Sequence, residues 1–211
     1  MIYKGNIYIG LSGATSSSSG SNNGGSTGGS VGSQLPQGWT IKDNLVVTAD
    51  FQTKGKGQRE KKWNSIKKKN LLFSLYINNH HFGLENKSYI NSITLLALVA
   101  TLENYINSSD IKIKKPNDIL IRGSKISGVL IETKISSKKI KSIIIGIGLN
   151  INQKKFPFEE NNPTSLYNLT NKEIDKKEVL NIFLEKFDML YNSFVKKDQK
   201  KINEKYLNYI L

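Results

Sequence analysis

Five short runs of aliphatic and β-branched residues limit most strongly the folds open to this chain. They span residues 45–51, 71–77, 119–122, 126–133 and 140–147. Their lengths and composition are typical of β-strands. Turn residues at 122–125 and 136–138 separate the last three runs, so we expect three successive antiparallel strands, a meander.

Helical patterns lie between and after these runs. Residues 88–106 repeat apolar side chains at helical spacing, with Ser88 available as the N-cap. Asp175 and Glu178 have the spacing of a capping box, which predicts the start of a second helix. Its apolar residues from Leu180 to Phe194 recur along one face, and we expect 198–211 to continue as helix. The order predicts an α+β fold: a mostly antiparallel mixed sheet packed by helices.

The N-terminal region has a different composition. Residues 10–34 are rich in Gly and Ser, which cannot bury apolar surface and behave as a flexible coil. We therefore expect an N-terminal strand over 1–9, a flexible segment over 10–34, and one folded domain over 35–211.

Composition excludes several functional classes. The chain has no cysteine, which rules out disulfides, thiolate nucleophiles and cysteine-based zinc sites. Its only histidines are His80 and His81, too few for a histidine-rich metal centre. No uninterrupted apolar stretch has the length of a signal-peptide core or a membrane span. We expect a cytoplasmic protein with no membrane partner.

The formal net charge of +14 is typical of proteins that bind nucleic acids. Arginine, whose planar fork suits phosphate and base recognition, occurs only at Arg59 and Arg122. This bias towards lysine favours compositional drift over selection for nucleic-acid binding. A non-enzymatic basic nucleic-acid-binding domain is kept as an alternative.

The first motif with chemical content follows directly on a predicted strand, from Gln52 to Trp63. Gly55 and Gly57 flank Lys56, so the backbone can approach a ligand closely while N–H groups and lysines face an anion. A solvated turn would have a similar composition, and both interpretations are open for this motif alone.

The second motif, Lys-Lys-Pro-Asn-Asp, begins at Lys114 and lies between two strands. Asn117 and Asp118 offer an amide and a carboxylate at a strand entrance, a combination suited to a base edge or a metal-bound phosphate. The alternative is a hairpin turn with no ligand.

Two further motifs lie on the last two strands. Lys125 opens a strand and Gly128 follows three residues later, which suggests a cation beside a point of close approach. Gly146 and Gly148 end the most apolar strand, and Asn150 follows. Taken singly, these are also explained by a surface lysine and a bent strand.

In this order and spacing, the four motifs resemble the signature series of biotin protein ligases, over about residues 45–152. The resemblance implies a class II synthetase-like biotin/lipoate ligase catalytic domain. It also implies an enzyme that uses ATP and Mg²⁺ to convert biotin to biotinyl-5'-AMP, and then transfers biotin to a lysine of a biotin carboxyl carrier protein. No DNA partner, helix-turn-helix or C-terminal β-barrel is expected, and a homodimer is compatible with the family.

The resemblance assigns roles to individual residues. The catalytic residues would be Lys125, Lys56 and Gln58. Biotin would be bound by Gln52, Gly55, Lys56, Gly57, Gln58, Lys125, Gly128 and Gly146, with Ser17, Ser18 and Ser19 as the upstream candidates. ATP would be bound by Trp63, Lys114, Asn117, Asp118, Gly148 and Asn150. No direct metal site is implied, because Mg²⁺ would be held mainly by the ATP phosphates, with Asp118 as a candidate ligand.

The sequence departs from the family pattern in several places. Lys56 stands where the family usually has arginine, Glu60 replaces a glycine, and Lys115 replaces a tryptophan. The family's upstream Ser-Thr-Asn element has no clear match. Two alternatives therefore stay open: a lipoate or octanoate protein ligase of the same fold, and a retained fold with impaired activity. The positive charge would have a use in steering an acidic carrier domain.

Overall fold

The structure is a computed structural model that describes residues 7–10, 44–58, 61–78, 82–137, 139–156 and 162–211. In these residues seven strands form a sheet in the order β1-β2-β3-β7-β6-β5-β4. The strands are β1 (Ile7–Gly10), β2 (Asn44–Ala49), β3 (Leu71–Asn78), β4 (Ile111–Lys114), β5 (Asp118–Ile121), β6 (Ser124–Ser136) and β7 (Lys139–Leu149). Most of the segment expected to be flexible, 10–34, lies outside the described residues.

The sheet is antiparallel except at one edge. β1 runs parallel to β2, and every other neighbouring pair is antiparallel. The predicted meander is confirmed as β5-β6-β7, and β4 extends it by one strand that the apolar runs did not include. The prediction of an α+β fold with a mostly antiparallel mixed sheet is thus confirmed.

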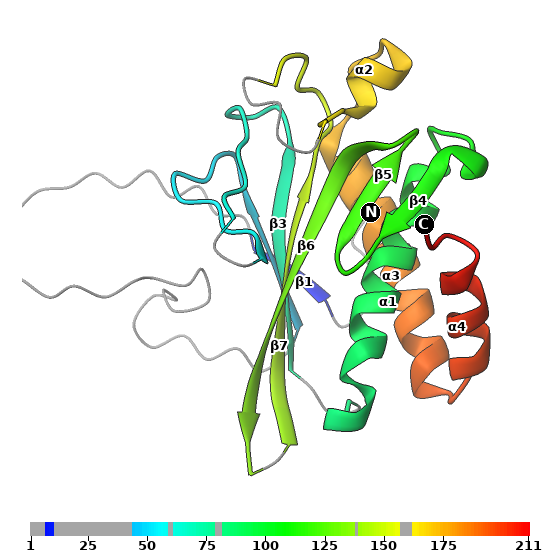
Figure 1. Cartoon of the computed structure of the whole chain (residues 1–211). Helices are drawn as coiled ribbons and strands as arrows, with labels where there is room; N and C mark the ends of the chain where they lie inside the picture. Colours follow the sequence, from blue (N-terminus) through cyan, green and yellow to red (C-terminus); the bar gives the residue numbers. More distant parts are fainter. Residues whose placement is uncertain (1–6, 11–43, 59–60, 79–81, 138, 157–161) are drawn as a thin grey trace, which may run out of the picture.

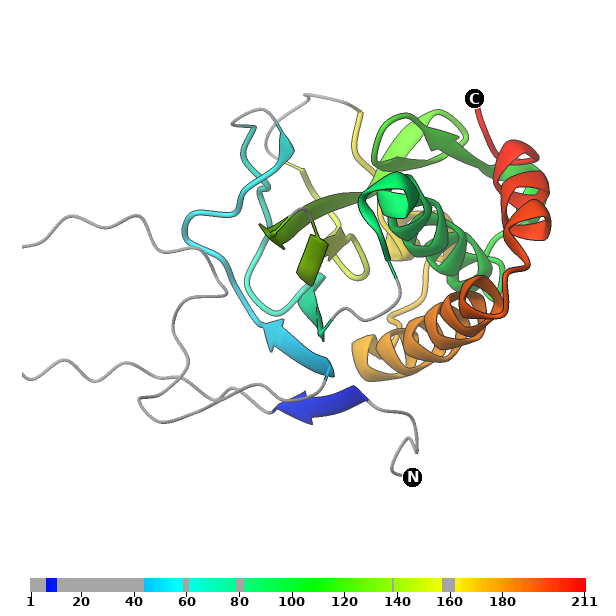
Figure 2. The ribbon, with the colours of Figure 1, turned by 90° about the horizontal axis from the view of Figure 1, so that it is seen from below.

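Two long helices cover one face of this sheet, and a shorter third helix packs against both of them, as Figures 1 and 2 show. They are α1 (Lys87–Leu102), α3 (Lys176–Val195) and α4 (Gln199–Leu207), and the short α2 (Leu166–Thr170) lies near one end of the sheet. In α1, seven consecutive residues from Ile93 to Val99 are buried, because the helix packs on the sheet on one side and on α3 and α4 on the other. No helix in the described part of the chain combines the length and apolarity needed to cross a membrane.

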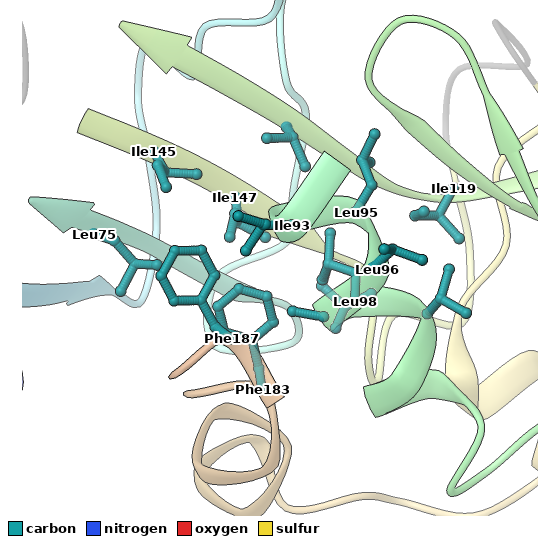
Figure 3. Packing of buried hydrophobic residues seen from close by; sticks show 14 of the residues in the cluster. Leu75, Ile93, Leu95, Leu96, Leu98, Ile119, Ile145, Ile147, Phe183 and Phe187 are labelled. Carbon is teal, nitrogen blue, oxygen red and sulfur yellow. The ribbon is translucent and has the colours of Figure 1, made fainter. Parts of the chain in front are cut away.

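The core lies between the sheet and the helices. Figure 3 shows Phe183 and Phe187 of α3 pointing towards Leu75 of β3, beside Ile145 and Ile147 of β7. Phe183 is completely buried, which confirms the apolar stripe predicted for this helix. The predicted N-cap is also confirmed, since the Asp175 carboxylate accepts a hydrogen bond from the Lys177 N–H.

The first long helix begins within one residue of the predicted start, but its predicted N-cap and its predicted end were wrong. A 3₁₀ turn over Leu84–Asn86 leads directly into α1, so the N-cap is Asn86 and Ser88 falls in the first turn. The helix ends at Leu102 rather than at residue 106. The next residues turn instead, with the N–H groups of Tyr105 and Ile106 both bonded to the Leu102 carbonyl.

The expectation that 198–211 continues as helix is confirmed for Gln199–Leu207, but it was wrong for the last four residues and for continuity with α3. Lys197 adopts a left-handed conformation, with φ 67°, which ends the preceding helix and starts a separate α4. After α4 the chain pairs with the outer edge of β4, where the Ile113 N–H donates to the Tyr209 carbonyl and the Leu211 N–H donates to the Ile113 carbonyl. The C-terminal residues thus cover an otherwise open strand edge.

Candidate functional site

The loop between β2 and β3 lies on the side of the sheet opposite the helices (Figures 1 and 2). It folds back on itself, because the Gly57 N–H donates to the Lys61 carbonyl at 2.6 Å and the Trp63 N–H donates to the Gly55 carbonyl at 3.0 Å. A Cβ atom at Gly55 would collide with the Trp63 carbonyl oxygen. Glycine at this position therefore lets the two arms of the loop approach each other.

A cleft of about 780 Å³ opens between this loop and the exposed face of the sheet. Its walls come from residues 51–57 and 61–66 of the loop, and from Leu130, Glu132 and Gln153. The volume is within the usual range for small-molecule sites. Five of the predicted residues line it: Gln52, Gly55, Lys56, Gly57 and Trp63.

The Trp63 indole lies on two strand glycines. A Cβ atom at Gly148 would overlap three atoms of the indole ring, and one at Gly128 would lie 3.2 Å from its Cζ3 atom. Gly128 and Gly148 pair directly across β6 and β7, and Asp118 of β5 pairs with Gly128. Residues from the last three motifs thus form one row across the sheet, with the tryptophan of the first motif on top of it.

Lys125 and Asp118 form an ion pair at one end of this row. The Lys125 Nζ atom lies 2.7 Å from the Asp118 Oδ1 atom, and both side chains are about one-fifth exposed. The same Nζ atom lies 5.8 Å from the centre of the Trp63 ring. The site therefore holds a partly desolvated ammonium group beside an aromatic ring and one carboxylate.

A β-bulge brings Lys125 to the same face as Gly128. Successive strand residues point to opposite faces, so two residues three apart would normally be on opposite sides of a sheet. The register between β5 and β6 shifts from Ile119–Ser127 to Leu120–Lys125, which leaves Ile126 as the extra residue. The bulge is held by a neighbouring strand end, since the Asn150 N–H donates to the Ile126 carbonyl.

The backbone around Lys125 is fixed by a later segment. The Lys125 N–H donates to the Asn162 carbonyl, and its own carbonyl accepts from the Thr164 N–H. The Asn150 amide nitrogen donates to the Thr164 carbonyl at 2.9 Å. Within the described residues, the buried Asn150 Oδ1 and Trp63 Nε1 atoms have no hydrogen-bond partner. An unpaired buried acceptor and donor at one site are groups that a ligand would satisfy.

Three other predicted residues lie near this row of residues but not in it. Gln58 lies in the loop, where its carbonyl accepts from the Lys61 N–H. Gly146 lies two residues before Gly148 in β7, so it points to the same face. The Asn117 amide is bonded to the Val129 carbonyl at 2.6 Å, which ties the second motif to β6.

Other predicted residues do not join the cluster. Lys114 is exposed at the end of β4 and forms no ion pair within the described part of the chain. Ser17, Ser18 and Ser19 lie outside the described residues, as does Glu60.

The sequence motifs gave no role to Leu130, Glu132 and Gln153 in the cleft wall, nor to four residues at the ends of the loop, Phe51, Asn64, Ser65 and Ile66. Leu130 and Glu132 continue the two-residue alternation that starts at Gly128, so the pattern of β6 contained a signal for them. Gln153 lies beyond β7 in irregular structure, and no local pattern marks it.

The charge of the cleft is mainly positive. Lys54, Lys56, Lys61 and Lys62 line it and are exposed, and none of them forms an ion pair with another described residue. In the same part of the chain, no three His, Cys, Asp or Glu residues lie together as a metal site. The arrangement suits an anionic ligand that carries any metal with it.

Comparison with known proteins gives consistent matches. The model of the biotin/lipoate A/B protein ligase family matches residues 33–150. The bifunctional ligase/repressor BirA of Bacillus subtilis is 34% identical over 158 residues, which cover 72% of this chain and 47% of that protein. The biotin--[acetyl-CoA-carboxylase] ligase of Mycobacterium tuberculosis is 25% identical over 53% of this chain and 41% of its own length.

A solved structure extends the similarity to the fold. The biotin protein ligase from Aquifex aeolicus, in complex with biotin and ATP, is 33% identical with a TM-score of 0.71, over 82% of this chain and 72% of that one. The present chain spans about half the length of the bacterial ligase/repressors that it matches. Because the family model matches more than half of the chain, the chain belongs to the biotin/lipoate A/B protein ligase family.

Proposed function

We propose that this chain is the catalytic domain of a biotin protein ligase. In the first step, an oxygen of the biotin carboxylate attacks the α-phosphorus of ATP, and pyrophosphate leaves with the electrons of the broken P–O bond. In the second, the amine of a carrier lysine attacks the carbonyl of biotinyl-5'-AMP, AMP leaves, and the amine loses a proton to solvent. The observation that carries the proposal is the Lys125–Asp118 pair beside Trp63, a residue that also lines the cationic cleft.

The reaction brings two anions together, so the site must supply positive charge where they meet. We assign Lys125 to the biotin carboxylate and then to the adenylate, because its ammonium is partly buried and close to the aromatic wall. Lys56 and Gln58 would donate to the acyl-phosphate from the loop. Lys56 contributes a point charge rather than the two-pronged contact of an arginine.

We divide the remaining residues into a biotin side and a nucleotide side, separated by Trp63. Gln52 and the loop glycines line the cleft where biotin would lie, and Gly128 and Gly146 are on the strand face below. Asn150, with its unpaired amide oxygen, is a candidate for the adenine amino group. We keep Asn117, Lys114 and Gly148 as nucleotide-side residues, with Asn117 acting through its contact with β6.

Mg²⁺ fits this site as a companion of the nucleotide. Asp118 is the carboxylate that contacts Lys125, through its Oδ1 atom. Asp118 would therefore hold the metal at most as one ligand, with the ATP phosphates providing most of the others. The metal, when bound, would neutralise phosphate charge.

For the partner, we propose a biotin carboxyl carrier domain. The support is the name of the Mycobacterium tuberculosis relative and the four exposed lysines of the cleft, which would attract an acidic carrier surface. We place the reaction in the cytoplasm and keep a homodimer as a prediction. If docking is steered by charge, biotinylation of the carrier will slow as salt rises while adenylation of free biotin is unchanged.

The test is biotin-dependent release of pyrophosphate from ATP. Lys125→Ala should lower kcat/KM by about 10²–10³-fold, the usual loss for one preorganised donor. Lys134→Ala, which removes an exposed lysine farther along the same strand, should leave the rate unchanged. Equal rates for Lys125→Ala and the wild-type protein would refute the assignment. Adenylation of lipoate but not of biotin would show that the substrate is lipoate rather than the proposed biotin.

A further inference from the structure

Gln153 is buried in the wall of the cleft, and both polar atoms of its side-chain amide form hydrogen bonds. It is 2% exposed. Its Oε1 atom accepts two hydrogen bonds, from the Ile66 N–H at 3.1 Å and from the Asn70 amide at 2.6 Å. Its Nε2 atom donates to the Lys155 carbonyl at 3.0 Å. One amide thus joins the end of the Trp63 loop to the segment that follows β7.

The loop is held to that segment at a second point by Asn70. This residue is 1% exposed, and its Oδ1 atom accepts from the Ile151 N–H at 3.2 Å. Asn70 and Gln153 therefore bind each other and also the opposite backbone. Since buried amides cost free energy when unpaired, the network favours one position of the loop over others.

Gln153 is also connected to the Lys125 side of the site. Its carbonyl accepts from the Ser165 hydroxyl at 2.6 Å. The residue before this serine, Thr164, donates its N–H to the Lys125 carbonyl and accepts from the Asn150 amide. A continuous series of hydrogen bonds thus runs from Ile66 through Gln153 and Ser165 to the backbone of Lys125.

We propose that Gln153 is a positioning residue for the ligase reaction. It fixes the segment that carries Trp63 relative to the segment that holds Lys125, so that the aromatic wall and the ammonium keep one geometry. This inference rests on the proposed function, because it concerns the two sides of the same site. It has two consequences: Gln153 supports biotin affinity, and it couples the binding of biotin to that of the nucleotide.

A matched control lies one residue away. The Asn152 amide is likewise doubly bonded, since it donates to the Ile174 carbonyl at 2.8 Å and accepts from the Ile174 N–H at 3.0 Å. These side-chain bonds fix the same segment to Ile174, just before α3. The Asn152 backbone N–H donates to the Lys69 carbonyl of the loop, and the substitution keeps that bond. Asn152→Leu therefore removes a comparable pair of hydrogen bonds without touching the proposed connection.

The first measurement needs no ligand. Hydrogen exchange of the Ile66 amide should be roughly tenfold faster in Gln153→Leu, because that N–H loses its acceptor. Gln153→Glu, which retains an acceptor oxygen, should recover most of the protection. In Asn152→Leu the Ile66 amide should exchange at the wild-type rate. Equal exchange in Gln153→Leu and the wild-type protein would overturn the positioning role, whatever the substrate.

The second measurement is the binding of biotin by calorimetry, with and without a non-hydrolysable ATP analogue. Gln153→Leu should weaken biotin by about 10–100-fold, the usual effect of losing a group that orients a binding residue, and should abolish the effect of the analogue on biotin affinity. Asn152→Leu should stay within about twofold of the wild-type affinity. Equal losses in both variants, or none in Gln153→Leu, would overturn the proposal. Wild-type protein that binds no biotin would instead refute the proposed function.

Discussion

Replacing Gly148 by alanine should destabilise the protein through a collision with Trp63. The added Cβ atom would overlap the indole, whereas the same change at Gly146 would place a Cβ at 3.6 Å from the Leu130 carbonyl oxygen, an ordinary contact. Both glycines are in β7, point to the same face and have extended backbone rather than positive φ. The two substitutions thus differ mainly in what the new methyl group meets.

The magnitude follows from two opposing effects. Alanine restricts the unfolded chain more than glycine does, which stabilises either variant by about 0.4–1 kcal/mol. Overpacking against a ring costs about 1–3 kcal/mol. The unfolded-state effect cancels when the two variants are compared. Gly148→Ala should therefore be less stable than Gly146→Ala by about 1–3 kcal/mol, with Gly146→Ala at least as stable as the wild-type protein.

Urea denaturation of a double-mutant cycle tests this explanation. In a Trp63→Ala background the indole is gone, so Gly148→Ala should lose its penalty and behave like Gly146→Ala. A penalty of equal size with and without the tryptophan would refute the reasoning. A wild-type free energy of unfolding for Gly148→Ala would also refute it, because the indole ring could then move away from the strand at no cost.

Three other substitutions test separate parts of the structure. Asp118→Asn keeps the side-chain shape but removes the charge that pairs with Lys125, so biotin-dependent pyrophosphate release should fall by about tenfold; an unchanged rate would argue against Asp118. Phe183→Ala empties a fully buried position and should cost about 3–5 kcal/mol in urea denaturation, with a cost below 1 kcal/mol contradicting the packing described. Burial raises the pKa of Tyr191 to about 12. Because the unfolded chain releases this proton near pH 10, the stabilisation is complete below about pH 10 and is lost as the pH rises towards 12. The melting temperature of Tyr191→Phe should therefore fall less than that of the wild-type protein between about pH 9.5 and 11; parallel curves would contradict the burial.

Local patterns in the sequence were enough to predict most strands and the apolar faces of the helices. β7 alternates between buried isoleucines and the small residues Gly146 and Gly148, and that alternation reflects a sheet with one packed and one open face. The residues at which the helices end were harder to predict. Lys197 ends α3 in a left-handed conformation that is unusual for lysine, and nothing in its neighbours specifies it.

Contacts between distant segments could not be derived from the sequence in the same way. The pairing of residues 209–211 with β4 depends on where α4 ends relative to a strand almost 100 residues earlier. Gln153 and Asn70 are single amides in irregular structure, 83 residues apart. Resemblance to a family located the motifs, but it contained no information about the hydrogen bonds that hold them together.

The bulge at Ile126 explains why the motif of Lys125 and Gly128 works at a spacing that a regular strand would not allow. In a regular strand the lysine would point into the helical layer, where it would be buried without a partner at a large cost in free energy. The extra residue turns Lys125 towards the open face, while Ile126 itself is completely buried. The shift also leaves Gly128 paired with Gly148 and with Asp118. The same irregularity therefore keeps a charge out of the core, places it beside its carboxylate, and leaves the two glycines aligned beneath Trp63.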